Sequence, residues 1–159
     1  MSIFYRSKRV GRGGKVFNMF KFKTLRDGSD GSMFADGTTY TKFGKILRRT
    51  HLDETPQIWN ILKGDMGFFG YRPEEPRTFD ILPQSMKDLL TPQKPGLLDL
   101  SSIYFFEEER LVQLGGQQTY WEKMKPMKFV LQAFYIENKC ALLNVALLWL
   151  ALRKVITRK

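Results

Sequence analysis

The chain has 159 residues, of which 43% are hydrophobic, 14% aromatic and 26% charged, and its formal net charge is +10. This length suits one domain with its own core, so we expect a single domain over residues 1–159. The single cysteine, Cys140, excludes an internal disulfide, and the single histidine, His51, excludes a histidine-rich metal site.

Basic residues are concentrated in the first third of the chain. Residues 1–50 hold 12 Lys or Arg and 3 Asp or Glu, a net of +9, whereas residues 51–159 hold 14 and 13, a net of +1. This asymmetry predicts an anionic partner: charge alone leaves open nucleic acid, an anionic membrane surface or a nucleotide diphosphate, besides a merely solvated basic surface. Because no nucleic-acid-reading motif is present, we expect no nucleic acid partner.

The N-terminal third is predicted to be a hairpin, a loop and two helices. Residues 4–25 alternate apolar and basic side chains around a glycine-rich turn, which predicts a β-hairpin flanked by Arg9 and Lys15. Residues 26–40 are rich in Asp, Gly and Ser and are predicted to be a loop. Helices are predicted over 42–49 and 53–62, and in the second we expect the buried face to consist of Ile58, Trp59 and Leu62.

The remaining chain is predicted to be mostly helical. A helix is expected over about 77–90, a strand over 97–106, another helix from Phe106, a break at Gly115–Gly116, and helix again from Lys125. Together these elements predict an α+β fold that is mostly helical with small antiparallel strands.

The segment Ala141 to Leu152 is almost entirely apolar and is followed by four cations within residues 153–159. It is too short to span a bilayer, which needs about 20 apolar residues. An apolar helix with a cationic end suits the interface of an anionic leaflet, but a core helix remains an alternative.

The stretch from Thr50 to Met66 is the part of the chain that says most about function. Proline is tolerated in the first turn of a helix, so Pro56 indicates that a helix begins near Asp53. Asp53 and Glu54 then lie at the positive end of the helix dipole, just after Arg48 and Arg49. This combination fits a site for phosphate chemistry. On residue types alone, a simple helix cap, including a Thr50–Asp53 capping box, is the more common role of such residues.

An ordered set of motifs covers nearly the whole chain. They are Arg9-Val10-Gly11, Lys21-Phe22-Lys23-Thr24, Leu52 to Gln57, Lys63 to Met66, Arg72-Pro73, Lys94-Pro95-Gly96 and Tyr135 to Asn138. This order resembles the bacterial sugar transferase family, monotopic membrane-associated phosphoglycosyl transferases that act on polyprenyl phosphate. Family members carry an apolar re-entrant membrane helix before the Arg-Val-Gly element, whereas only eight residues precede Arg9 here. The resemblance therefore leaves two possibilities: an active transferase, or a truncated inactive relative that retains the fold.

The resemblance implies a reaction and a set of site residues. A sugar 1-phosphate would pass from a UDP-sugar to polyprenyl (undecaprenyl) phosphate, the first membrane step of exopolysaccharide, O-antigen or glycoconjugate synthesis, at the cytoplasmic face of the bacterial inner membrane. By the resemblance, Asp53 is the nucleophile that forms an aspartyl-phosphosugar, and Glu54 assists the acceptor or orients the site. Mg²⁺ is expected, with Asp53 as its protein ligand. Phosphate-binding roles are implied for Arg48, Arg72, Lys21, Lys23 and Arg9.

Overall fold

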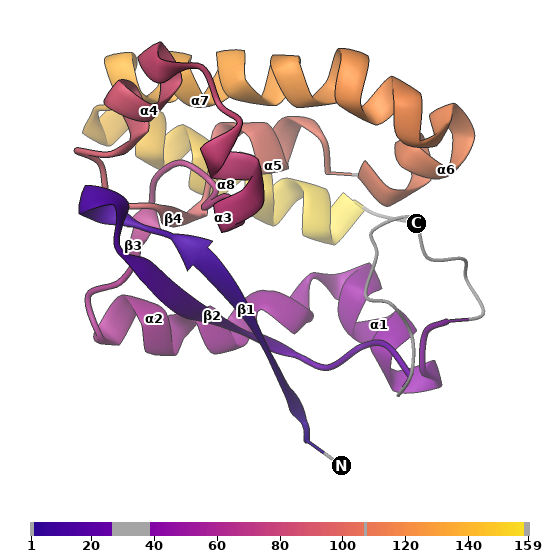
Figure 1. Ribbon diagram of the computed structural model, residues 1–159. Coiled ribbons are helices and arrows are strands. Elements are labelled where there is room, and N and C mark those ends of the chain that lie inside the picture. The colour runs from indigo at the N-terminus through magenta and orange to yellow at the C-terminus, as the bar shows by residue number, and fades with distance from the viewer. Residues whose placement is uncertain (1, 27–38, 107, 158–159) are drawn as a thin grey trace.

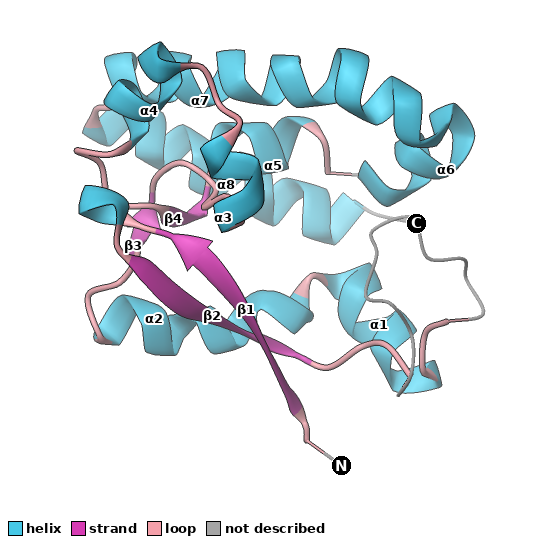
Figure 2. Cartoon of the chain, in the orientation of Figure 1, coloured by secondary structure: helices cyan, strands magenta, loops and turns pink. Residues whose placement is uncertain are grey.

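A computed structural model describes residues 2–26, 39–106 and 108–157 of the chain. Helices dominate, as Figure 2 shows, with one antiparallel strand pair and one short parallel pair. This confirms the predicted α+β class. The elements in chain order are β1 (Phe4–Val10), η1 (Arg12–Gly14), β2 (Val16–Phe22), α1 (Lys42–Thr50), η2 (Leu52–Gln57), α2 (Ile58–Leu62), β3 (Gly67–Phe69), α3 (Pro76–Asp80), α4 (Gln84–Leu90), β4 (Gly96–Leu98), α5 (Leu100–Tyr104), α6 (Glu108–Thr119), η3 (Tyr120–Met124), α7 (Lys125–Asn138) and α8 (Ala141–Thr157).

The predicted hairpin is confirmed as β1 and β2, which pair antiparallel from Phe4↔Phe22 to Val10↔Val16. Its turn uses Gly13 and Gly14 at φ 70° and 74°, a region that glycine enters without strain. In Figure 1 the hairpin runs diagonally from the upper group, which contains α3 to α8, down across the lower row formed by α1 and α2.

The free edge of β2 is covered by a side chain rather than by another strand. Asn60 of α2 is completely buried. Its Oδ1 accepts from the Phe20 N–H at 3.1 Å, and its Nδ2 donates to the Asn18 carbonyl at 2.8 Å. This pair of bonds supplies what a neighbouring strand would supply, and it attaches the segment that follows Glu54 to the hairpin.

The predicted buried face of α2 is wrong. Ile58, Trp59 and Leu62 are 52%, 60% and 72% exposed. The inward positions are taken by Gln57 and Asn60, because Asn60 must face the β2 edge to make its two hydrogen bonds. The predicted helix over 42–49 is confirmed as α1, and it too carries exposed apolar side chains, Phe43 and Ile46.

Two further predictions require correction. The single helix over 77–90 is two helices, α3 and α4, because Pro83 directly precedes Gln84 and its fixed backbone starts a new helix. The strand over 97–106 ends at Leu98. Asp99 then caps α5 by accepting a hydrogen bond from the Ser102 N–H at 3.0 Å, so the chain turns into a helix.

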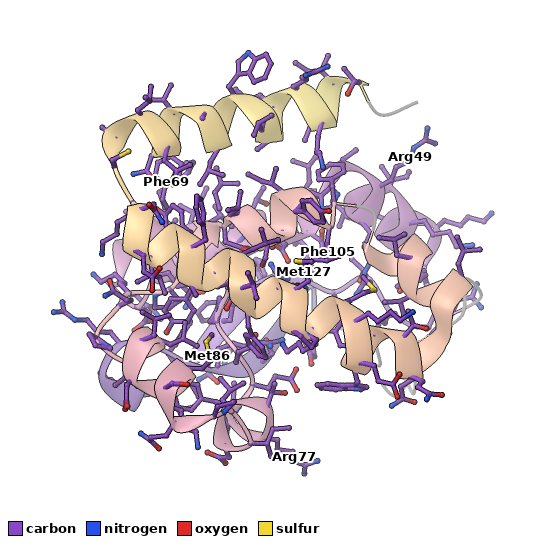
Figure 3. All side chains as sticks on the ribbon, turned by 90° about the horizontal axis from the view of Figure 1, so that it is seen from above. Arg49, Phe69, Arg77, Met86, Phe105 and Met127 are labelled. Carbon is purple, nitrogen blue, oxygen red and sulfur yellow. The ribbon has the colours of Figure 1, made fainter. Side chains whose placement is uncertain are left out.

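The C-terminal half behaves largely as predicted. The break expected at Gly115–Gly116 falls inside α6, where Gly116 has φ 72° and ψ 177°. Helix resumes by Lys125, as α7, followed by α8. Figure 3 shows α8 at one edge of the molecule, with Phe69 near the point where α7 passes into α8, and Phe69 packs against the main hydrophobic core. Tyr71, Leu90, Tyr135 and Leu147 are the centre of that core.

The parallel pair β3–β4 depends on Gly70 and Gly96, whose lack of a side chain lets the two backbones lie in contact. Gly67 pairs with Gly96 and Phe69 with Leu98. A Cβ on Gly96 would lie 2.1 Å from the Gly70 nitrogen, which no side chain can occupy. Because the strands are parallel, the residues that follow them, Arg72 after β3 and Asp99 after β4, emerge at the same end.

Candidate active site

Asp53 and Glu54 lie in the first turn of the 3-10 helix η2, as Pro56 predicted. The capping-box alternative is wrong. The Thr50 hydroxyl instead donates to the carbonyls of Ile46 and Leu47, and His51, which precedes η2, makes no side-chain cap. His51 reverses the chain between α1 and η2 with φ 56°, and its ring lies 4.2 Å from that of Phe106.

The Glu54 carboxylate is held by two cations from two other parts of the chain. Lys21 Nζ on β2 lies 2.6 Å from Glu54 Oε1. Arg72 Nη2 lies 2.7 Å from the same oxygen, and Arg72 Nη1 lies 3.4 Å from Oε2, so the guanidinium faces the carboxylate with both nitrogens. Such fork-to-carboxylate pairing fixes orientation as well as charge.

Asp53 has a different environment. Its side chain is buried, with 8% exposure, and among the described residues no hydrogen bond or ion pair engages its carboxylate. Burial, reinforced by the neighbouring Glu54 charge, raises the pKa of Asp53, and the cations Lys21, Arg48 and Arg72 oppose this rise. Asp53 is therefore a carboxyl group without a hydrogen-bond or ion-pair partner among the described residues, set among the positive charges of Lys21, Arg48 and Arg72.

Glu54 shifts in the opposite direction. Burial alone would raise its pKa, but the charges and hydrogen bonds of Arg72 and Lys21 hold the pKa of Glu54 well below its usual range. Burial in turn lowers the pKa of Lys21, against the stabilising charge of Glu54. Two adjacent carboxyls thus have their pKa values moved apart, a pattern that marks different chemical roles.

The predicted phosphate-binding residues are only partly brought together. Arg48 approaches the pair from α1, and its guanidinium bonds to Thr24 Oγ1 at 3.1 Å and to Tyr40 Oη at 3.0 Å. Arg9 pairs with Glu75 at 3.1 Å. Burial and the nearby charge of Arg72 lower the pKa of Arg9, which places it at the margin of the same cationic cluster.

Lys23 lies just beyond the end of β2, where its backbone N–H donates to the Ile3 carbonyl at 2.8 Å. Within the described part of the chain, no hydrogen bond or ion pair joins Lys23 to Asp53 or Glu54. The site proper therefore consists of Asp53, Glu54, Lys21, Arg48 and Arg72, with Arg9 beside it.

Sequence reasoning missed a polar group on the opposite wall. Arg72 Nη1 lies 3.5 Å from Ser102 Oγ, and the Ser102 hydroxyl donates to Asp99 Oδ2. Asp99 is only 1% exposed and also accepts from the Ser101 hydroxyl. The order Asp-x-Ser-Ser is a helix-start signal that could have located this group, although not its contact with Arg72.

The residues present fit a divalent cation that is shared with a phosphorylated substrate. No group of three or more Asp, Glu, His or Cys able to enclose a metal occurs in the described ranges. Mg²⁺ does not need one, because it commonly takes one or two carboxylates together with substrate phosphates and water. The unpartnered carboxylate of Asp53 suits that role, whereas Glu54 is already bound to two cations.

Two carboxyls with oppositely shifted pKa values, set among lysine and arginine side chains on a small α+β fold, are a suitable site for a group-transfer enzyme. Comparison with known proteins agrees: the profile described as "Bacterial sugar transferase" matches residues 1–158. The chain belongs to the bacterial sugar transferase family and is a transferase.

Its relatives include proteins named as sugar transferases and proteins named as undecaprenyl-phosphate phosphotransferases. "Uncharacterized sugar transferase EpsL" of Bacillus subtilis is 32% identical over 158 residues, which cover 97% of this chain and 70% of the relative. "UDP-N-acetylgalactosamine-undecaprenyl-phosphate N-acetylgalactosaminephosphotransferase" of Aeromonas hydrophila is 42% identical over 81 residues, 48% of this chain and 19% of the relative. "UDP-glucose:undecaprenyl-phosphate glucose-1-phosphate transferase" of Xanthomonas campestris is 45% identical over 76 residues, 45% of this chain and 16% of the relative.

Proposed function

We propose that the protein transfers a sugar 1-phosphate from a UDP-sugar to polyprenyl phosphate, with Asp53 as the nucleophile. The observation that carries this proposal is the contrast within the carboxyl pair: Glu54 is bound by Lys21 and Arg72, whereas Asp53 has no partner in the described chain. A nucleophile must keep its lone pairs available, so the chemistry belongs to Asp53. The names of the relatives from Aeromonas and Xanthomonas supply the donor and acceptor classes.

The reaction would proceed in two displacements at one phosphorus. In the first, an Asp53 carboxylate oxygen bonds to the sugar-bearing phosphorus, the bond from that phosphorus to the bridging oxygen breaks, and UMP leaves. In the second, an oxygen of polyprenyl phosphate bonds to the same phosphorus and the Asp53–phosphorus bond breaks, which regenerates the carboxylate. Bound Mg²⁺ would neutralise charge on the diphosphate, with Asp53 as a protein ligand.

The cations would stabilise the charge that both displacements move. Arg48, Arg72 and Lys21 come from α1, from the segment after β3, and from β2, so they surround the Asp53–Glu54 turn from different sides. Because the pKa of Glu54 is held low, Glu54 is a poor proton acceptor. We therefore assign it the orienting role, in which it fixes Lys21 and Arg72, rather than deprotonation of the acceptor.

An anionic membrane surface is the proposed location of the reaction, at the cytoplasmic face of the inner membrane. On α8, Leu142, Val145, Trp149, Leu152 and Ile156 are exposed. Beyond this apolar face, the Arg153 guanidinium lies 5.4 Å from the Trp149 ring, an arrangement suited to lipid headgroups. None of the described helices has both the length and the apolar content needed to cross a bilayer. Exposed apolar side chains on α1 and α2, such as Phe43 and Trp59, also suit contact with a membrane surface.

Intact-mass spectrometry tests the first displacement directly. The purified protein is incubated in detergent with individual UDP-sugars and Mg²⁺, without acceptor, beside the Asp53→Asn variant. We expect a mass increase equal to one sugar phosphate, released by polyprenyl phosphate and missing in Asp53→Asn. A folded wild-type protein that gains no mass with any donor would instead favour an inactive relative that retains the fold.

A further inference from the structure

We infer that Ser102, fixed by Asp99, is a positioning residue for Arg72 and thereby sets the affinity of the site for the donor diphosphate. This inference rests on the proposed function and adds a specific pair of residues to it. Arg72 Nη1 lies between two acceptors, Glu54 Oε2 at 3.4 Å and Ser102 Oγ at 3.5 Å, while Nη2 is bonded to Glu54 at 2.7 Å.

The direction of the hydrogen bonds gives Ser102 a defined role. A serine hydroxyl has one proton and two lone pairs. Ser102 gives its proton to Asp99 Oδ2, so the lone pairs of Oγ remain for Arg72. Asp99 cannot turn away, because it is buried and its Oδ1 accepts from both the Ser101 hydroxyl and the Ser102 N–H.

The backbone explains why these residues meet although they are 30 positions apart in the chain. Arg72 follows β3 and Asp99 follows β4, and the two strands are parallel. Gly70 N donates to the Leu98 carbonyl at 3.1 Å, and Gly96 N donates to the Tyr71 carbonyl at 2.9 Å. These bonds hold the two strand ends together immediately before Arg72 and Ser102.

Without Ser102, the guanidinium would lose one of the two acceptors that orient it among the described contacts. A substrate phosphate must compete with Glu54 for Arg72, and a guanidinium that is free to rotate pays more ordering entropy when it binds that phosphate. Ser102 would restrain Nη1 through a second contact besides the one to Glu54 Oε2. The expected consequence is tighter binding of the donor, with a smaller effect on the chemical step.

The chain contains a matched control in Ser101. Its hydroxyl bonds to the same Asp99 carboxylate, and no bond joins it to Arg72 in the described chain. In single-turnover adduct formation, we expect Ser102→Ala to raise the half-saturating donor concentration about three- to tenfold. Ser102→Thr, which keeps the hydroxyl, should restore it, and Ser101→Ala should change it by less than about twofold. Equal effects of Ser101→Ala and Ser102→Ala would overturn the inference.

Double-mutant cycles provide a test that needs no turnover. If Ser102 acts on Arg72, the effects of Ser102→Ala and Arg72→Ala on the unfolding equilibrium constant should be non-additive by about two- to tenfold. Those of Ser101→Ala and Arg72→Ala should simply add. Additivity in both cycles would reject the Ser102–Arg72 coupling whatever the reaction, whereas coupling in a protein that forms no adduct would reject only the proposed function.

Discussion

Arg72 and Glu54 face each other through two contacts, Nη2 to Oε1 at 2.7 Å and Nη1 to Oε2 at 3.4 Å. The pair joins the segment after β3 to the first turn of η2, with Lys21 bonded to the same Oε1. An arginine that recognises a carboxylate in this way cannot be replaced by lysine without losing one of the two contacts.

This pair should make stability depend on pH. We expect Arg72→Ala to lower the free energy of unfolding at pH 7 by about 1–3 kcal/mol, since both side chains are partly buried. Because the folded-state pKa of Glu54 is lowered, its contribution is present above the unfolded-state pKa and is lost as pH falls through the folded value. The deficit of the variant should therefore shrink toward low pH.

Urea unfolding between pH 3 and pH 8 measures that deficit. Arg77→Ala is the control, because Arg77 is exposed and points away from the protein (Figure 3). A deficit in Arg72→Ala that stayed constant over the whole range would contradict the assignment of the charge interaction.

Asp53 should control the acidic side of the activity profile. If Asp53 is the proposed nucleophile, its raised pKa means that it becomes protonated, and adduct formation slows, at a higher pH than for an ordinary aspartate. Glu54→Gln removes the neighbouring negative charge, so the acidic limb should move to lower pH. The pH dependence of adduct formation checks this, and an unchanged or raised limb would show that Asp53 is not the titrating group. Asp53→Asn should lose more than about a thousandfold in rate.

The buried ion pair Glu74–Lys125 should be a structural support for the site. Lys125 Nζ lies 2.6 Å from Glu74 Oε2, both side chains are 9% exposed, and Glu74 lies two residues after Arg72. We expect Glu74→Ala to lower stability by about 3–5 kcal/mol, because it leaves Lys125 buried without its carboxylate. The double variant Glu74→Met/Lys125→Met should recover much of this loss in chemical denaturation. A double variant as unstable as Glu74→Ala would argue that the charges themselves are required.

Gly96→Ala should separate the two strands that carry Arg72 and Ser102. Its methyl group would lie 2.1 Å from the Gly70 nitrogen and 2.4 Å from the Phe69 carbonyl carbon, so backbone must move. We expect a loss of about 2–4 kcal/mol together with weaker donor binding. Gly11→Ala is the milder control, since its methyl would lie 3.1 Å from the Phe17 ring and 3.4 Å from the Lys15 carbonyl oxygen. Thermal unfolding measures the loss of stability in Gly96→Ala and Gly11→Ala, and the donor dependence of adduct formation measures the loss of donor binding in each.

Trp149 should contribute to membrane binding and not to folding. It is 57% exposed on α8, two residues from the completely buried Leu147. Trp149→Ala should reduce partition into phosphatidylglycerol-containing vesicles by about tenfold without lowering the melting temperature. Leu147→Ala should instead destabilise the fold by about 2–5 kcal/mol. If vesicle binding is unaffected by Trp149→Ala, α8 is not the membrane-facing element.

Local signals predicted the hairpin, α1, the start of η2 and the break at Gly116, because each depends on residues close together in the chain. The same signals failed for Ile58, Trp59 and Leu62. Apolar spacing identifies one face of a helix but does not say whether that face meets a core or the exterior, and here the polar Asn60 faces inward. In the predicted strand over 97–106, the capping power of Asp99 outweighed the apolar pattern.

The two carboxyls of the candidate site could be predicted from the sequence, but not all of the residues around them could. Asp53, Glu54, Lys21, Arg48 and Arg72 were all expected by motif, and the structure places them together. Ser102 was not expected, because its contact with Arg72 requires the parallel pairing of β3 and β4, and no local pattern encodes which distant strand becomes a neighbour.

The bonds from Asn60 to the edge of β2 also bear on self-association. An uncovered strand edge offers free N–H and C=O groups to other molecules, and a two-stranded hairpin is marginally stable by itself. Asn60 occupies the Phe20 N–H and the Asn18 carbonyl on that edge. The turn that carries Asp53 and Glu54 is thus continuous with the segment whose Asn60 side chain covers the edge of β2, and we expect replacement of Asn60 to favour aggregation as well as to loosen the candidate site.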